Sequence, residues 1–389
     1  MGYKLRCIVI LCVGILHFSC TNFKSPNQNL DDAVMINVSM KPEKIDFVDL
    51  IENVQFIPLE TSSISLIGDV DKIICYHSDY YILDREKSKG LYRFNAEGKF
   101  LNMIGRNGRG PGEYSDPADF IVNSSGLIVL DHRSRTLLFY DYDGNYKSTV
   151  PLEYIIYEIT GMQDENLIFA VAGDNRHRNE AKDYETLILN VNGEFVSAGI
   201  HNKFEMNYSY PYCSFLYDGK IKYSKSLRSM TYAIDSEGVY GDYYINILDS
   251  PLPTDYEQEC KGNFEQFRKK FRGNYNYFGG KFFENDDVVF FTTQDKERQS
   301  YWNVYDKETT TTSTGLISLS TQDDTKRFGP KDMIFLSGIN SHWVGQGEDI
   351  IGCLSAVSLT LDDFSLEFPA LDSLKINDNP VVFRFKFKL

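Results

Sequence analysis

The chain has 389 residues, of which 42% are hydrophobic, and its formal net charge is −15. This length is sufficient for a large buried core, and the acidity excludes nucleic-acid binding through basic patches that contact phosphates. Aromatic residues are abundant but uneven, with 26 Tyr and 27 Phe against 2 Trp. Because Tyr and Phe favour strands, the composition predicts an all-β protein.

The N-terminal segment is typical of a cleaved targeting signal. Lys4 and Arg6 precede the apolar run 7–16, which as a helix would span about 15 Å, half the hydrocarbon thickness of a bilayer. The run leads to Cys20, preceded by a serine, in a context that resembles the lipobox of bacterial lipoproteins. We therefore predict a lipoprotein signal peptide over 1–20, lipidation at Cys20 and an outer-membrane anchor on the periplasmic or surface face. A plain secretory signal is the alternative.

The residues after the signal divide into a short tether and one large domain. Residues 21–40 are polar with little periodicity, which predicts a flexible tether, and residues 41–389 form the domain. Four later cysteines stand far apart without any CxxC pair, which favours single buried thiols over disulfides or zinc ligands. These cysteines are Cys75, Cys213, Cys260 and Cys353.

A strand–turn–strand unit recurs along the first part of the domain. Its two clearest copies share an apolar strand that ends in an aspartate, Asp84 in one and Asp131 in the other. Each copy then has an acidic or amide residue followed by glycine, which supplies the positive φ that tight hairpin turns need. The turn glycines are Gly98, Gly144, Gly193 and Gly238.

These glycines are 45 to 49 residues apart, and units of about 40 to 50 residues that hold four short strands are typical of β-propeller blades. The length of the domain predicts six four-stranded antiparallel blades, with seven as the alternative. The sequence repeat is interrupted at about 251–278. The residues at helical spacing there are Cys260, Phe264, Phe267 and Phe271. We predict a short helical insertion there, with a helix over roughly 255–271.

The C-terminus predicts how the ring closes. Phe383, Phe385 and Phe387 alternate with basic residues, so the aromatic side chains would face the core. We expect this final strand to complete a blade with the early strand near 54–57, which would remove exposed strand edges.

Several stretches resemble the six-bladed β-propeller lipoproteins of anaerobic Gram-negative bacteria, namely 56–73, 80–84, 93–120 and 379–389. The segment 105–131 also resembles the NHL repeat, with a Gly-x-x-Gly run, Gly-Glu-aromatic, Pro and a strand that ends in Asp. The resemblance implies six blades and a location in the cell envelope. It implies little about activity, because most members of that family have no assigned function.

The glycine-rich loop 105–114 is the most distinctive candidate site. Its glycines would present backbone N–H groups, and Arg106 and Arg109 would add positive charge beside Glu113 and Tyr114, a combination suited to a carboxylate or phosphate. It is not a Walker A loop, because no Gly-Lys-Ser/Thr follows. The alternative is a connection between blades in which the arginines pair with acids such as Glu113.

A second candidate is the charged loop 173–180, in which Arg176 and His177 would touch a ligand at one face of the ring. A solvated loop is the alternative. The stretch 141–145 imitates the start of a calcium loop, but Leu152 stands where a bidentate glutamate belongs, so a hairpin turn is the better interpretation. No histidine pair has metal-ligand spacing, and we predict neither a metal nor a cofactor.

Together these features predict a binding or assembly module of the cell envelope that recognises a peptide, glycan or partner protein. We expect a monomer that meets the membrane only through its lipid. The alternative is an enzyme, a lyase or hydrolase acting on glycans or peptides, with its site in the central funnel, since propellers host both kinds of function. Convergent acidic and basic side chains in the funnel would favour the enzyme.

Overall fold

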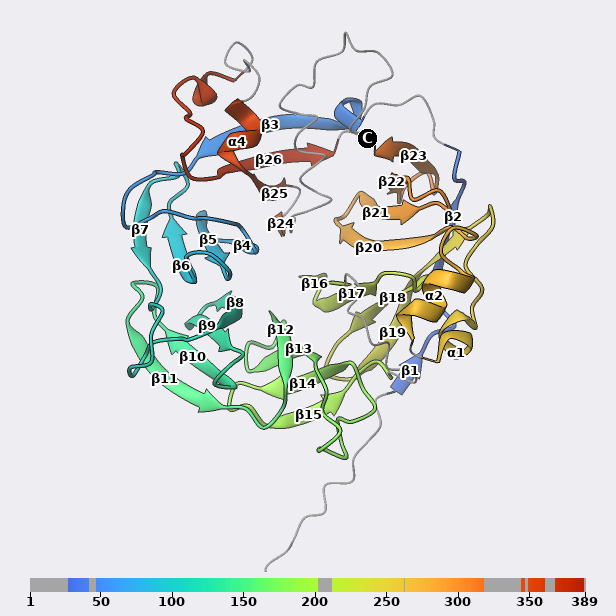
Figure 1. Cartoon of the computed structure of the whole chain (residues 1–389), viewed down its shortest axis with the longest axis horizontal. Helices are drawn as coiled ribbons and strands as arrows, with labels where there is room; N and C mark the ends of the chain where they lie inside the picture. Colours follow the sequence, from blue (N-terminus) through green and yellow to red (C-terminus); the bar gives the residue numbers. More distant parts are fainter. Residues whose placement is uncertain are drawn as a thin grey trace, which may run out of the picture.

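The computed structural model describes residues 27–41, 47–201, 212–261, 263–317, 344–346, 349–360 and 368–387. Six sheets stand as blades around a central axis in these residues (Figure 1). The predicted six-bladed β-propeller is therefore confirmed, and the described residues hold no seventh blade. The predicted signal peptide, with Cys20, lies outside the described residues.

Each blade has four strands, numbered here in chain order and running from the axis outward. The first blade comprises β4 (Lys72–Tyr76), β5 (Asp79–Asp84), β6 (Gly90–Phe94) and β7 (Phe100–Met103), and the second β8 (Pro117–Asn123), β9 (Gly126–Asp131), β10 (Thr136–Tyr140) and β11 (Tyr146–Pro151). The third blade comprises β12 (Ile156–Gly161), β13 (Leu167–Ala172), β14 (Thr186–Asn190) and β15 (Phe195–Ala198), and the fourth β16 (Tyr212–Tyr217), β17 (Lys220–Lys225), β18 (Met230–Ile234) and β19 (Gly238–Ile247).

The last two blades complete the ring. The fifth comprises β20 (Tyr277–Glu284), β21 (Val288–Gln294), β22 (Ser300–Asp306) and β23 (Thr312–Ile317). The sixth comprises β24 (Val344–Gln346), β25 (Asp349–Leu354), β26 (Val381–Phe387) and, outermost, β3 (Ile51–Pro58). The short helices α4 (Ala356–Thr360) and η2 (Pro369–Leu371) lie between β25 and β26, and η1 (Phe47–Leu50) precedes β3.

The two ends of the domain share the sixth blade, as predicted. β26 pairs antiparallel with β3, and Phe383 stands opposite Phe56. Phe383 and Phe385 are fully buried, whereas Arg384 between them is only partly buried and forms an ion pair with Asp349. The alternation of the final strand therefore points its aromatic side chains into the core.

The repeated glycines lie where each blade contacts the preceding one. Gly98, Gly144 and Gly193 all have positive φ in the turn between the third and fourth strands of successive blades. A Cβ on Gly144 would lie 2.2 Å from the carbonyl oxygen of Met103, at the end of the preceding blade's outer strand. Glycine is thus required both for the turn and for the close approach of two backbones.

The fourth predicted turn glycine is different. Gly238 begins β19 and is not among the residues with positive φ. The side chain of Asp235 accepts hydrogen bonds from the backbone N–H groups of Glu237 and Gly238 at 2.8 and 3.0 Å. This turn is one residue shorter than the one at Gly144, because the Asp235 N–H donates to the Gly238 carbonyl oxygen whereas the Asp141 N–H donates to that of Asn145. Gly238 is therefore already part of the strand.

The aspartate shared by the two clearest repeats holds loops together. Asp84 is fully buried and accepts hydrogen bonds from the backbone N–H groups of Gly68 at 2.7 Å and Lys87 at 2.9 Å. Asp131 similarly accepts from the N–H of Ser115 at 2.7 Å. Each aspartate therefore joins the connection that enters its blade to strands two and three of that blade.

The prediction of a flexible tether over 21–40 is wrong for the part of this segment that the structure describes. β1 (Asn27–Asn29) and β2 (Val34–Val38) both pair in parallel with β19, outside the fourth blade. Ile36 and Val38 are fully buried. Their alternation buries one face of β2 in a cluster with β19 and the fifth blade, which outweighs the polar composition of the segment.

The helical insertion is confirmed, but as two helices rather than one. α1 (Tyr256–Cys260) ends at Lys261, whose φ is +47°, and α2 (Phe264–Lys270) begins after Asn263. The Asn263 side chain accepts hydrogen bonds from the N–H groups of Glu265 and Gln266, an N-cap that starts a new helix. The two helices bury an aromatic cluster against the fourth and fifth blades: Leu227, Leu252, Tyr256, Cys260, Phe267 and Phe271.

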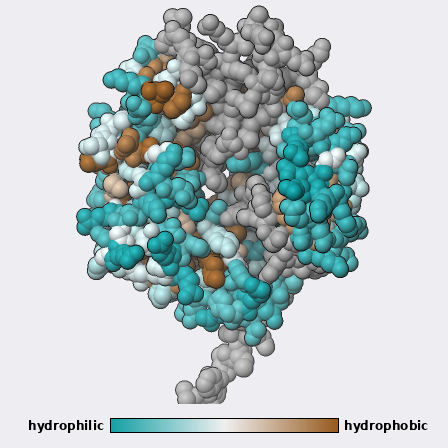
Figure 2. Space-filling model, in the orientation of Figure 1, coloured by the Kyte–Doolittle hydropathy of each residue, from teal (hydrophilic) through white to brown (hydrophobic). Residues whose placement is uncertain are grey.

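The described part of the chain includes no helix with the length and apolarity to cross a bilayer. The visible face of the molecule is mostly hydrophilic, with apolar residues in small separate patches (Figure 2). The four described cysteines form no disulfide with one another, as predicted; Cys260 and Cys353 are buried, and Cys75 and Cys213 are partly buried.

The close contact between adjacent blades at Gly144 predicts that an alanine there lowers the stability of the protein more than an alanine at Gly219. Gly219 has φ +73° with no atom within 4 Å of a built Cβ, so Gly219→Ala should cost only the left-handed strain, about 1–2 kcal/mol. Gly144→Ala should cost about 1–3 kcal/mol more because of its contact with Met103. Urea denaturation of both variants measures the difference, and equal losses would contradict a role for Gly144 between blades.

The buried Asp84 predicts a pH-dependent contribution to stability. Burial alone would raise the pKa of Asp84, but hydrogen bonds from the N–H groups of Lys87 and Gly68 lower it below its ordinary value. Its stabilisation is therefore complete above the unfolded pKa, about 3.9, and is lost as the pH falls through the folded pKa.

Asp84→Asn should lower the free energy of unfolding by about 2–3 kcal/mol at pH 7, because the amide N–H donors would face the backbone N–H donors that Asp84 now accepts from. The gap from the wild type should close below about pH 4 in urea titrations. Asp183→Asn, at an exposed aspartate, is the control and should change little at any pH. A gap for Asp84→Asn that persists unchanged at pH 3 would contradict this account.

Candidate functional site

The innermost strands converge on a cavity at the axis of the ring. Each runs from the connection between blades toward the turn that leads into its second strand. The strands β4, β8, β12, β16 and β20, with these turns, line a cavity of about 580 Å³, which we call the funnel. Its wall is largely apolar, with Ile74, Tyr76, Val122, Met162, Phe215 and Leu216 among the lining residues.

The other end of the axis is narrower and charged. A cavity of about 40 Å³ shares Lys72 and Ser214 with the funnel and is also lined by Asp119 and Glu158. Lys72 Nζ lies 2.7 Å from Asp119 Oδ1 and donates to the carbonyl oxygen of Ile159 at 3.2 Å. Asp119 Oδ2 accepts from the N–H of Ile159 at 2.8 Å. This ion pair thus joins the inner strands of three consecutive blades.

Further polar contacts continue around the axis. Thr160 and Ser214 hydroxyls lie 2.8 Å apart, and the Cys213 thiol donates to the carbonyl oxygen of Phe282 at 3.3 Å. Burial raises the pKa of Cys213, which favours the neutral thiol. Burial also lowers the pKa of Lys281, more than neighbouring Cys213 and Glu158 raise it.

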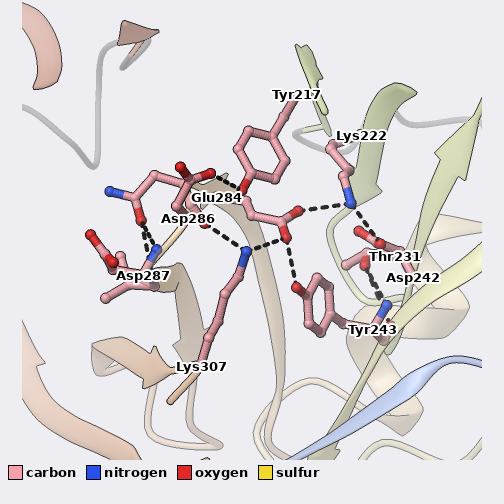
Figure 3. A network of polar contacts seen from close by, with 11 residues as sticks. Tyr217, Lys222, Thr231, Asp242, Tyr243, Glu284, Asp286, Asp287 and Lys307 are labelled. Atoms are coloured by element: carbon pink, nitrogen blue, oxygen red, sulfur yellow. Dashed lines mark hydrogen bonds and ion pairs between the residues drawn. The ribbon is translucent and has the colours of Figure 1, made fainter. Parts of the chain in front are cut away.

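A buried ionic network joins the fourth and fifth blades beside the funnel (Figure 3). Glu284 is 4% exposed and lies 2.9 Å from Lys222 Nζ and 2.7 Å from Lys307 Nζ. It also accepts a hydrogen bond from the Tyr243 hydroxyl at 2.6 Å, and Lys222 pairs with Asp242 at 2.7 Å. Four chain segments from two blades are held together in this way.

The charges of this network compensate one another. Burial alone would lower the pKa of Lys222, but Glu284 and Asp242 raise it above its ordinary value. Burial raises the pKa of Asp242, against the opposing effect of Lys222. Buried ions persist only when paired in this way. The network therefore stabilises the contact between blades and leaves its lysines engaged.

The glycine-rich loop 105–114 connects the first and second blades. Arg106 Nε lies 3.0 Å from Glu113, and the N–H of Gly110 donates to Glu113 at 2.8 Å. The pKa of Glu113 is lowered, first by this hydrogen bond and then by Arg106. Tyr114 is fully buried, and its hydroxyl donates to the carbonyl oxygen of Ile104. The pairing is the one that the alternative interpretation expected, while Arg109 is exposed.

The second predicted site lies in the loop between β13 and β14. Arg176 is exposed and pairs with Asp174, whose pKa falls to about 2 chiefly through hydrogen bonds from Arg176. His177 Nε2 lies 3.3 Å from the carbonyl oxygen of Glu153. Neither Arg176 nor His177 lines the funnel.

The structure does not bring the two predicted sites together at the axis. The loop 105–114 is a connection between blades, and the loop 173–180 lies between a second and a third strand. Both are at the end of the ring opposite the funnel mouth. Sequence reasoning placed the alternative enzymatic site in the central funnel but named none of the residues that line it, although the repeat contained a signal for them. Asp84 and Asp131 mark second strands, so the strands before them, β4 and β8, are the innermost ones.

The predicted hairpin over 141–145 is confirmed, since Asp141 accepts hydrogen bonds from the N–H groups of Asp143 and Asn145 at 3.0 and 2.8 Å. Within the described ranges, no three His, Cys, Asp or Glu side chains gather as a metal site requires.

The comparisons with known proteins agree with this architecture. A family model described as a domain of unknown function (DUF4934) matches residues 33–386. A putative exported protein from Bacteroides fragilis NCTC 9343 is similar in structure, with 16% identity, a TM-score of 0.73, and coverage of 92% of this chain and 100% of that one. A DUF4221 member from Bacteroides vulgatus ATCC 8482 has 10% identity, a TM-score of 0.50, and coverage of 87% and 98%. No curated protein matches.

Proposed function

This chain belongs to the DUF4934 family, and from that premise and the funnel we propose that it is a binding module of the cell envelope. The observation that supports this proposal is the cavity of about 580 Å³ with a largely apolar wall at the axis of the ring. Its volume lies within the roughly 300–1,000 Å³ of ordinary ligand pockets, which are mostly apolar with a few placed polar groups. The funnel accordingly receives an apolar part of a peptide, glycan or protein ligand.

The two buried carboxylates beside the funnel support binding over catalysis. Asp119 is satisfied by Lys72 and by backbone N–H groups, and Glu284 by two lysines and a tyrosine. No histidine is among the described residues that line the funnel. An enzyme would use acidic and basic groups aimed at a substrate, whereas these carboxylates join strands to one another.

The apolar wall predicts binding of a neutral hydrophobic probe. Leu216 lines the funnel and is 40% exposed, so Leu216→Lys should place a charge in the cavity without disturbing the core. Wild-type protein should bind the neutral dye Nile red saturably, with a blue-shifted emission, and Leu216→Lys should weaken this binding at least about tenfold. Fluorescence titration measures both.

Leu101→Lys is the matched control, because Leu101 is 45% exposed on the outer strand β7. It should bind the dye as the wild type does. Equal binding by Leu216→Lys and the wild type, or no saturable binding by any form, would reject the funnel as the binding site.

We further infer that a lipid on Cys20 holds the ring at the outer membrane. Support comes from the lipobox-like context of Cys20 and from the exported character of the similar Bacteroides fragilis protein. Only residues 21–26 separate Cys20 from β1, and they reach at most about 20 Å. Because β1 and β2 pair with β19, the ring would stay close to the membrane rather than move on a long tether.

Cys20→Ala should move the protein from the membrane fraction to the soluble fraction and abolish labelling by radioactive palmitate. Cys7→Ala, which changes a cysteine inside the apolar run, is the control and should remain labelled and sedimenting. If Cys20→Ala protein still carries palmitate, the anchor is not at Cys20.

A further inference from the structure

The two ends of the ring carry different kinds of turn. Turns between first and second strands lie beside turns between third and fourth strands, as the hydrogen bond from the Tyr142 hydroxyl to the Asn123 carbonyl oxygen at 2.6 Å shows. The N–H of Val191 likewise donates to the Asn166 carbonyl oxygen at 2.9 Å. We call this end, at which the funnel opens, the turn face.

The turn face is strongly acidic. Acidic residues occur in most of its described turns, including Glu97, Glu194 and Glu237 away from the axis. No arginine occurs in the described turns of this face, and their lysines are Lys99 and Lys307, of which Lys307 is engaged with Glu284. The described turns of this face therefore carry a net negative charge.

The arginines gather at the opposite end of the ring. The loops between second and third strands carry, among others, Arg85, Arg133, Arg178 and Arg298. Arg178 pairs there with Glu153 at 2.7 Å. The ring is thus electrically unequal from one end to the other.

Three acids stand at the mouth of the funnel, and we call them the rim: Glu165, Asp218 and Asp286. They come from the first turns of three successive blades, are exposed, and are lining residues of the funnel. None of them belongs to an ion pair between described residues. Glu165 accepts from the N–H of Ser124 at 3.1 Å, and Asp286 from the Tyr217 hydroxyl at 2.7 Å.

Resting on the proposed function, we propose that the ligand is a basic peptide segment of another protein, with an aromatic or aliphatic side chain flanked by Lys or Arg. The apolar side chain enters the funnel and the cationic groups meet the rim. Opposite charges at close range favour association, and like charges oppose it. The acids farther out extend the attraction beyond the funnel mouth, which suits a polypeptide better than a small amine.

The test compares three peptides of one length on the folded domain by calorimetry: acetyl-Lys-Phe-Lys-Phe-Lys-amide and its Gln and Glu counterparts. The Lys peptide should bind about tenfold more tightly than the Gln peptide, and the Glu peptide more weakly still, as several exposed charge pairs imply. The preference should shrink at 1 M salt, where the screening length falls to about 3 Å.

The rim is tested by a triple variant, Glu165→Gln, Asp218→Asn and Asp286→Asn, whose amides can still accept the hydrogen bonds from Ser124 and Tyr217. It should bind the Lys and Gln peptides equally. A triple variant with the same change of charge at exposed acids on the opposite end should keep the tenfold preference: Glu86→Gln, Asp183→Asn and Glu297→Gln.

The outcomes separate this proposal from the binding function itself. If the Lys and Gln peptides bind equally well and Leu216→Lys abolishes both, the funnel remains a binding site but the preference for basic ligands is wrong. If both triple variants lose the preference alike, net charge rather than the rim is responsible, and the proposal fails. Absence of binding by every peptide also overturns it, while Nile red binding still reports on the funnel.

Discussion

The pairing of β26 with β3 is the constraint on which the rest of the ring depends. It joins residues from the two ends of the domain, with Val382 opposite Ile57 and Phe383 opposite Phe56. Without it, β3 would have no blade and β26 would present an open edge. Ring closure also fixes how far the innermost strands stand from the axis. The width of the funnel therefore follows from a contact made at the outer part of the sixth blade.

Adjacent blades are joined by different means around the ring. In the first three blades, positive-φ glycines such as Gly144 bring a turn against the outer strand of the preceding blade. Between the fourth and fifth blades, where the sequence repeat fades, the ionic network around Glu284 joins the two sheets. Buried ions require nearly complete pairing to offset the cost of desolvation. Glu284 accordingly pairs with Lys222 and Lys307 and accepts a hydrogen bond from Tyr243.

The fold was predictable where it depends on patterns among neighbouring residues in the sequence. The prediction failed where strands far apart in the sequence pair with each other. The turn at Gly98 and the alternation around Phe385 depend on neighbours in the sequence, so both were correctly predicted. β2 was missed because its five residues find their partner far away, with Ile36 opposite Ile245. The lining residues of the funnel were missed because each blade contributes only a few of them and no linear motif results. The loop 105–114 resembles a ligand-binding loop, yet Glu113 occupies the space beside Gly108 and Gly110.

The division of charge between the two ends follows from how each end is built. The connection between the first and second blades is long enough to supply its own counter-ion, as Arg106 does for Glu113. Loops between second and third strands pair across blades, as Arg228 does with Glu185. The tight turns of the other end have few residues, and the three acids of the rim belong to no ion pair between described residues. Salt screens the charge of an acid such as Asp218 at distances beyond about 8 Å. Close to the funnel mouth, its attraction for a cationic ligand is almost unscreened. A ligand is thus guided over the last stretch of its approach, where the apolar wall cannot yet attract it.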